Sequence, residues 1–237
     1  MLLELKNLSK AFGAVVVAAD VNLAVDEGEA LGVIGPNGAG KSSIFNLISG
    51  TLAPDSGTVQ LDGEDITREP PRRRVLAGIG RSHQVPQPFE HLTVFENTVV
   101  AACFGSGGTE EAVRDRVVEI LYSTKLLPKA NLPAGALTLL ERKRLEMTRA
   151  LATGPRLLLL DEIAGGLTEG ECQELVATVQ DIRSQGMTII WIEHVTHALL
   201  AVIDRLVALD FGKIIAEGAP REVMNSDAVQ RIYMGVD

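Results

Sequence analysis

The chain has 237 residues, of which 46% are hydrophobic and 22% charged, so it is an ordinary globular sequence long enough to bury a full α/β core. Its 22 Lys and Arg against 31 Asp and Glu give a formal charge of −9, which argues against a nucleic-acid-binding protein, because such proteins need a basic face to neutralise phosphates. The run Arg72-Arg73-Arg74 is a local exception, which we interpret as a solvated loop or helix face rather than a binding patch.

The cysteines and the apolar segments bear on the cellular compartment. Cys103 and Cys172 lie far apart without metal-ligand spacing, so we expect reduced thiols in a cytosolic protein. The first ten residues lack the continuous apolar stretch of a signal peptide. Because no apolar run approaches the ~18 residues that span a bilayer, we expect any work at a membrane to be that of a peripheral subunit.

The first part of the chain predicts short strands joined by turns. Leu2–Leu8 alternates between apolar and polar residues, and Ala30–Ile34 is a short apolar strand. Thr58–Leu61 and Glu64–Ile66 flank Asp62-Gly63, a pair that supplies the positive φ angles of a tight turn. We therefore expect a hairpin there.

The middle of the chain, from about residue 85 to residue 152, has a helical pattern instead. Thr93-Val94-Phe95-Glu96 is a capping box that opens a helix, and Glu110–Leu127 has helical spacing. We interpret this part as a helical insertion.

After the insertion, strands and helices alternate again. Strands are expected at Arg156–Leu160 and Thr188–Ile192, where every residue after the first is apolar, as in buried parallel strands, and a helix is expected between them at Glu169–Ser184. A second hairpin and a closing helix are predicted at Leu206–Leu209, Lys213–Ala216 and Asp227–Met234. This alternation predicts a mostly parallel sheet with helices on both faces.

A phosphate-binding motif follows the strand Ala30–Ile34 directly. Glycines let backbone N–H groups wrap around phosphate oxygens, and the N-terminus of the next helix, Ser43–Ser49, adds its positive dipole. We expect Lys41 to reach the β- and γ-phosphates and the Ser42 hydroxyl to bind Mg²⁺. The motif fits G-x-x-x-x-G-K-[ST] without a mismatch, and the predicted nucleotide-binding residues are Gly35, Pro36, Asn37, Gly38, Ala39, Gly40, Lys41, Ser42 and Ser43.

Two carboxylates stand at the end of the apolar strand that follows the insertion. The carboxyl ends of such strands are where ligands bind in an open α/β sheet. We expect Asp161 to hold Mg²⁺, mainly through a water molecule, and Glu162 to orient and deprotonate the attacking water. Taken alone, a strand-end Asp-Glu is more often a solvated turn; the phosphate-binding motif is what favours the catalytic interpretation.

His194 follows the second buried strand and Glu193. A single histidine at a strand end is most often structural. Its place beside the strand that carries Asp161-Glu162 favours a catalytic contact to the γ-phosphate as the alternative.

The chain resembles the nucleotide-binding subunit of an ATP-binding-cassette (ABC) transporter over nearly its whole length. The resemblance lies in the order of its motifs: phosphate-binding loop, glutamine, helical insert, Asp-Glu and strand-terminal His. The resemblance implies that Phe12 stacks on adenine, the alternative being a core or surface Phe. It implies that Gln84 joins the Mg²⁺ chemistry to the membrane partner. ATP is the expected nucleotide, because the chain has no Asn-Lys-x-Asp guanine motif.

Finer motifs resemble one subfamily, the ATPases of branched-chain (hydrophobic) amino-acid uptake systems. They are Thr93-Val94-Phe95-Glu96-Asn97, Arg144-Leu145-Glu146-Met147-Thr148-Arg149-Ala150-Leu151, Ile192-Glu193-His194 and Phe211-Gly212-Lys213-Ile214-Ile215-Ala216-Glu217-Gly218.

The chain departs from the family pattern in the signature motif, "LSGGQ" or "LSYGQ", which aligns with Leu137–Glu141. Thr138 keeps the hydroxyl that would touch the γ-phosphate bound by a partner subunit, in trans. Leu140 replaces a glycine that allows close backbone approach, and Glu141 places a negative charge near phosphate. Ile163 replaces the usual proline after Asp-Glu. Thr168 stands at the D-loop position and is equally suited to cap the next helix with Glu171.

Together these features predict a single α/β cassette with a P-loop core and a small antiparallel β-subdomain (1–84 and 154–237) and a helical subdomain inserted at 85–153. The resemblance implies a cytoplasmic protein, peripheral on the inner face of the cell membrane. Its expected partners are a second ABC ATPase as homo- or heterodimer, with the heterodimer favoured, two permease subunits and, indirectly, an external solute-binding protein. Three alternatives stay open: a lipid or lipopolysaccharide exporter, a soluble cassette ATPase that acts on nucleic acid or ribosomes, and a non-catalytic regulatory cassette.

Overall fold

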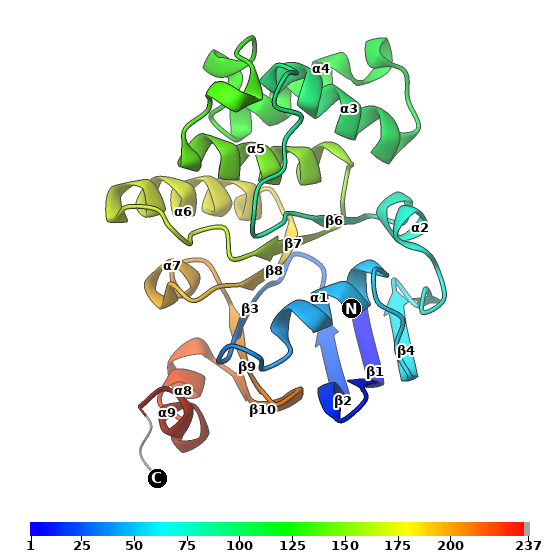
Figure 1. The fold of residues 1–237 in the computed structure, drawn as a ribbon, viewed down its shortest axis with the longest axis vertical. Coiled ribbons are helices and arrows are strands. Elements are labelled where there is room, and N and C mark those ends of the chain that lie inside the picture. Colours follow the sequence, from blue (N-terminus) through cyan, green and yellow to red (C-terminus); the bar gives the residue numbers. More distant parts are fainter. Residues whose placement is uncertain (235–237) are drawn as a thin grey trace.

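The computed structural model describes residues 1–234, which form a six-stranded sheet, a four-stranded sheet and a group of helices (Figure 1). In chain order the elements are β1 (Leu3–Phe12), β2 (Val15–Val25), β3 (Ala30–Ile34), α1 (Lys41–Ser49), β4 (Ser56–Leu61), β5 (Glu64–Asp65), α2 (Pro71–Leu76), β6 (Ile79–Arg81), α3 (Val94–Ser106), α4 (Glu110–Ser123), the 3₁₀ turns η1 (Leu127–Lys129) and η2 (Ala134–Ala136), α5 (Leu139–Ala152), β7 (Leu157–Asp161), α6 (Glu169–Ser184), β8 (Thr188–Ile192), α7 (Thr196–Leu200), β9 (Arg205–Asp210), β10 (Lys213–Gly218), α8 (Pro220–Met224) and α9 (Asp227–Met234).

The larger sheet has the strand order β10-β9-β3-β8-β7-β6, and all its pairs are parallel except β9 with β10. Alternate residues of β3 serve two cores. Leu31 and Val33 pack with helix α1 on one face, whereas Ala30 and Ile34 pack with α6 on the other. The predicted mostly parallel sheet with helices on both faces is therefore confirmed.

The smaller sheet is antiparallel, with the order β2-β1-β4-β5. Positive φ angles at Asp62 (52°) and Gly63 (79°) form the predicted turn between β4 and β5. The sequence prediction ended the first strand too early and left out β2. Register shifts between β1 and β2 explain this, because they interrupt the two-residue alternation on which the prediction depended.

Helices α3, α4 and α5 pack together at one end of the molecule (Figure 1), around their own cluster of buried apolar residues. Thr93 caps α3 in a complete capping box with Glu96, as predicted. The predicted helix Glu110–Leu127 is too long, since Lys125 adopts a positive φ of 62° after α4 ends at Ser123. Within the described chain, no helix is long and apolar enough to span a bilayer.

The basic run lies on the short helix α2, and one of its residues corrects the sequence interpretation. Arg72 and Arg73 are exposed as expected, but Arg74 is only 1% exposed. Its guanidinium donates hydrogen bonds to the carbonyl oxygens of Leu47 (2.6 Å) and Ile48 (2.9 Å) at the end of α1. Arg74 therefore satisfies C-terminal carbonyl groups of the helix that follows the phosphate-binding motif, a structural role.

Candidate nucleotide-binding site

The phosphate-binding motif forms a tight loop between β3 and α1. Gly40, with a φ of 100°, directly precedes the first residue of α1. A Cβ atom at Gly40 would lie 2.3 Å from the carbonyl oxygen of Val17, so only glycine fits. The loop thus brings the N-terminus of α1 to the carboxyl edge of the parallel sheet, where the helix can bind an anion.

Lys41 lies across this loop. Its side chain is buried, and Nζ donates hydrogen bonds to the carbonyl oxygens of Gly35 (2.8 Å) and Pro36 (3.0 Å). Burial lowers the pKa of Lys41, and the nearby carboxylates of Glu162 and Asp161 oppose that shift. The two carboxylates thus favour the charged ammonium next to the loop.

Two predicted site residues from different segments, Gln84 and His194, contact the carboxylate of a third, Glu162. Glu162 follows β7 and has a positive φ of 47°. One of its oxygens, Oε1, lies 2.7 Å from Nε2 of His194, and the other accepts a hydrogen bond from the Gln84 side-chain amide. The structure therefore brings Gln84, Glu162 and His194 together, although 110 residues separate the first from the last.

Only one of the two carboxylate oxygens of Asp161 has a hydrogen-bond partner among the described residues. Its Oδ2 accepts a hydrogen bond of 2.9 Å from Arg81, whereas its buried Oδ1 has no hydrogen-bond partner among the residues that the structure describes. An unpaired buried carboxylate oxygen is costly unless a cation or a water molecule binds it. Asp161 and the Ser42 hydroxyl are oxygen donors of the kind that Mg²⁺ prefers, so these residues fit the ion.

Phe12 lies at the end of β1 and is 54% exposed, which makes its ring available for stacking and excludes a core position. The ammonium group of Lys10 lies 5.4 Å from the ring centroid. The same ammonium group pairs with Asp55 at 2.6 Å, so the cation beside the ring is itself held in place.

The altered signature segment begins helix α5. The Thr138 side chain accepts a hydrogen bond from the Glu141 backbone N–H, and the Glu141 carboxylate accepts one from the Thr138 N–H at 3.0 Å. The carboxylate also lies 3.1 Å from Nζ of Lys129. Leu140 is buried, only 6% exposed. Glu141 thus places its own negative charge on the helix N-terminus, an end whose dipole favours anions.

Thr168 forms the same kind of capping box with Glu171 at the start of α6. Its role as helix cap is therefore confirmed.

Lys143 and Glu193 are buried charged residues beside the site to which the sequence alone assigned no role. The Lys143 ammonium donates hydrogen bonds to the carbonyl oxygens of Glu162 (3.1 Å) and Gln84 (3.4 Å). Glu193, 1% exposed, accepts hydrogen bonds from the backbone N–H groups of Ala164 and His194, both at 2.9 Å. Lys143 could have been noticed, because it falls on the core-facing stripe of α5 three residues after Leu140, where a charge needs a buried partner.

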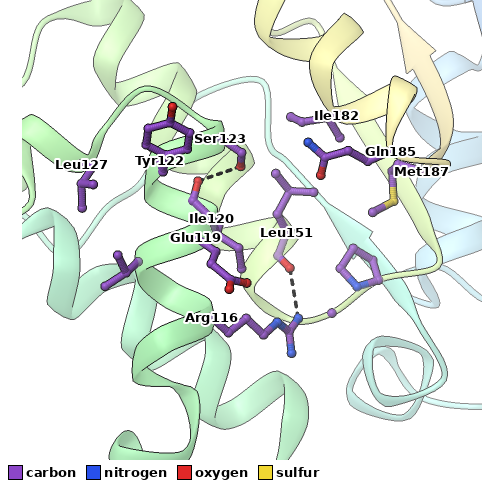
Figure 2. Close-up of a pocket in the computed structure, with 13 residues that line it drawn as sticks. Arg116, Glu119, Ile120, Tyr122, Ser123, Leu127, Leu151, Ile182, Gln185 and Met187 are labelled. Carbon is purple, nitrogen blue, oxygen red and sulfur yellow. Dashed lines mark hydrogen bonds between the residues drawn. The ribbon is translucent and has the colours of Figure 1, made fainter.

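A cavity of about 880 Å³ lies elsewhere, between α4 and the C-terminal end of α6 (Figure 2). Arg116 reaches across one side of it and donates a hydrogen bond of 3.4 Å to the Leu151 carbonyl oxygen. The residues that line it include no member of the phosphate-binding loop and neither Asp161 nor Glu162. The cavity therefore lacks the groups of the phosphate-binding motif, and the loop between β3 and α1 remains the candidate nucleotide site.

Comparison with known proteins agrees with this geometry. Residues 18–165 match the ABC transporter family, and residues 213–237 match the family described as "Branched-chain amino acid ATP-binding cassette transporter". The chain is 34% identical to the lipopolysaccharide export system ATP-binding protein LptB of Haemophilus influenzae, over 99% of this chain and 97% of that protein. It is 32% identical to the high-affinity branched-chain amino acid transport ATP-binding protein BraF of Pseudomonas aeruginosa, over 99% and 98%.

Solved structures show the same fold. A crystal structure of the ADP conformation of an ATP-binding cassette of an ABC transporter superposes with a TM-score of 0.91 at 31% identity, over 99% of both chains. The dimeric structure of a bacterial ABC transporter cassette superposes with a TM-score of 0.82 at 25% identity, over 92% of this chain and 99% of that one. The chain belongs to the ABC transporter family, as an ATP-binding and ATP-hydrolysing cassette subunit.

Proposed function

We propose that this cassette drives the uptake of branched-chain or other hydrophobic amino acids. The observation that carries this proposal is the match of residues 213–237 to the branched-chain amino acid cassette family, at a segment outside the general ABC transporter match. The similarity to BraF and the motifs at residues 93–97 and 144–151 point in the same direction.

Export of lipopolysaccharide is the second candidate. The similarity to LptB is about as strong as that to BraF and covers as much of the chain, so identity alone does not separate the two. A cassette does not contact the transported solute at its ATP site, which is why the two functions can share one set of ATPase residues.

Within the ATP site we assign each residue a role from its position. Residues 35–43, from Gly35 to Ser43, wrap the phosphates, with Lys41 on the β- and γ-phosphates, and Phe12 stacks on adenine. Ser42, Asp161 and Gln84 would hold Mg²⁺, which would neutralise phosphate charge.

Glu162 is the general base, and His194 contacts the γ-phosphate. In the structure His194 and Gln84 both contact the Glu162 carboxylate. We infer that these contacts break when ATP binds, which would free the Gln84 side chain to serve as a metal ligand and the Glu162 carboxylate to accept a proton from water.

We further propose that two cassettes close head to tail around two ATP molecules, each contributing Thr138 and its neighbours to the site of the other. The helical subdomain, 85–153, carries this signature face, and residues 1–84 and 154–237 carry the P-loop face. Closure drives two permease subunits that receive solute from an external binding protein, and the cassette sits at the inner face of the membrane.

Inactivating the gene in its native host tests the transport proposal. Uptake of labelled leucine at low external concentration is expected to fall and to return with the wild-type gene but not with Lys41→Ala. Normal leucine uptake together with loss of surface lipopolysaccharide would favour the exporter instead. A wild-type chain that co-purifies with ribosomes or nucleic acid, and not with permeases from solubilised membranes, would contradict both transport functions.

A further inference from the structure

Arg81 makes an unusual set of contacts beside the ATP site. It ends β6, three residues before Gln84, and its side chain is only 12% exposed. One guanidinium nitrogen, Nη2, donates to Oδ2 of Asp161 at 2.9 Å. The other, Nη1, donates to Oδ1 of Asn46 at 2.7 Å and to Oγ of Ser49 at 3.2 Å.

These contacts join three elements of the ATP site. Asn46 and Ser49 belong to α1, whose first turn carries Lys41 and Ser42. Asp161 ends β7. The guanidinium also lies 5.6 Å from the centroid of the Phe45 ring on α1, which restricts its position further. Arg81 thus holds the helix that carries one oxygen donor against the strand that carries the other.

The way in which Arg81 binds Asp161 leaves one carboxylate oxygen available. Arg81 occupies Oδ2, and the buried Oδ1 is without a hydrogen-bond partner within the described part of the chain. A carboxylate held by one oxygen has a fixed orientation, and the other oxygen keeps its full capacity to accept from a metal ion or its water.

We propose that Arg81 is a positioning residue for Mg²⁺: it fixes the Asp161 carboxylate through Oδ2, which leaves Oδ1 available as a metal ligand, and it fixes the distance between α1 and β7. The inference rests on the proposed Mg²⁺-ATP site but concerns a residue outside the loop and outside the Asp-Glu pair. Two effects oppose each other here. The positive charge of Arg81 repels a divalent cation, whereas its hydrogen bonds orient the ligand; we expect orientation to dominate, since loss of such supporting contacts typically costs about 10- to 100-fold in metal affinity.

The test measures metal binding separately from hydrolysis. Mn²⁺ binding to the ADP complex of the full-length protein is followed by electron paramagnetic resonance, and ADP affinity is measured without metal in EDTA. Arg81→Met removes both charge and donors, whereas Arg81→Lys keeps the charge but cannot reach Asp161 and Asn46 together. Arg205→Met is the matched control, because Arg205 pairs with Glu29 at 2.6 Å, partly buried, and contacts none of the proposed site residues.

We expect Arg81→Met and Arg81→Lys to weaken Mn²⁺ binding at least about 10-fold while metal-free ADP affinity stays near that of the wild type. Arg205→Met should leave both constants unchanged. Unchanged or tighter Mn²⁺ binding in Arg81→Lys would overturn the proposal and leave Arg81 a purely structural residue. If Arg81→Met does not fold, Arg81→Lys and Asn46→Ala carry the test, and Asn46→Ala should weaken Mn²⁺ binding in the same direction. A wild-type protein that does not bind ADP would instead contradict the ATP site itself.

Discussion

Lys41 is the residue whose substitution should weaken the ATP site most. Its buried ammonium lies against the loop carbonyl groups, and a hydrogen bond to a charged partner contributes roughly 1.5–3 kcal/mol. Lys41→Ala should therefore weaken ATP binding at least about tenfold and abolish turnover, as measured by titration with a fluorescent ATP analogue.

Arg205→Met is again the control, because Arg205 is a partly buried cation that pairs with Glu29 and contacts none of the proposed site residues. Its ATP affinity should stay near that of the wild type. Equal affinities for the wild type and Lys41→Ala would mean that the loop does not bind the phosphates.

The residues of the loop and the Asp-Glu pair could be predicted from the sequence, because their chemistry depends on neighbours along the chain. The contacts of Glu162 with Gln84 and His194 could not, since they depend on how three strands align in the sheet. Arg74 shows the reverse case: its neighbours in sequence are exposed arginines, yet it is buried against carbonyl groups of a helix more than twenty residues earlier.

At the scale of elements, the start of helix α5 determines how well this cassette can complete the ATP site of a partner cassette. The Glu141 carboxylate caps the helix and carries a negative charge to the place where the partner's γ-phosphate is expected. Burial opposes the shift, but hydrogen bonds from Thr138 and Lys129 hold the pKa of Glu141 below its usual value, so it is charged at neutral pH. A homodimer would have two sites with this charge, and a heterodimer with a standard cassette only one.

Glu141→Gln tests this directly, since glutamine can keep the capping box while removing the charge. We expect ATPase activity of the chain alone to rise about fivefold, which corresponds to roughly 1 kcal/mol. Glu171→Gln, the same capping-box position on α6, should leave activity unchanged. Leu140→Gly is a poorer probe, because Leu140 is buried and its removal would open a cavity.

If the purified chain has strong ATPase activity without a second cassette, and Glu141→Gln does not change that activity, there is no reason to infer a pair of two different cassettes. Activity that rises only when a neighbouring cassette is added would support the heterodimer.

Some helices and strands could be predicted accurately from the sequence, and others could not. Helix α6 and strand β8 have the predicted bounds, because a capping box marks the start of one and a fully apolar run defines the other. Helix α2 and strand β6 were not predicted. The first is six residues with three arginines, the second only three residues, and both exist because neighbouring elements pack against them.

At the scale of the whole molecule, the fold and the family are established, whereas the dimer is a proposal. If ATP joins two copies across their loops and signature helices, a variant that binds but does not hydrolyse ATP should accumulate as a dimer. Sedimentation velocity of Glu162→Gln should show a dimer with ATP and Mg²⁺ and a monomer with ADP. A monomer under both conditions, with ATP bound, would contradict closure between two copies of this chain.

The most direct measurement is steady-state phosphate release from ATP and Mg²⁺ by the purified wild-type chain and by Glu162→Gln, assayed side by side. Glutamine keeps the shape of the side chain but cannot take a proton from water, so release should fall at least ~100-fold while ATP binding persists. A variant that releases phosphate at nearly the wild-type rate would contradict the assignment of Glu162 as the base on which hydrolysis depends.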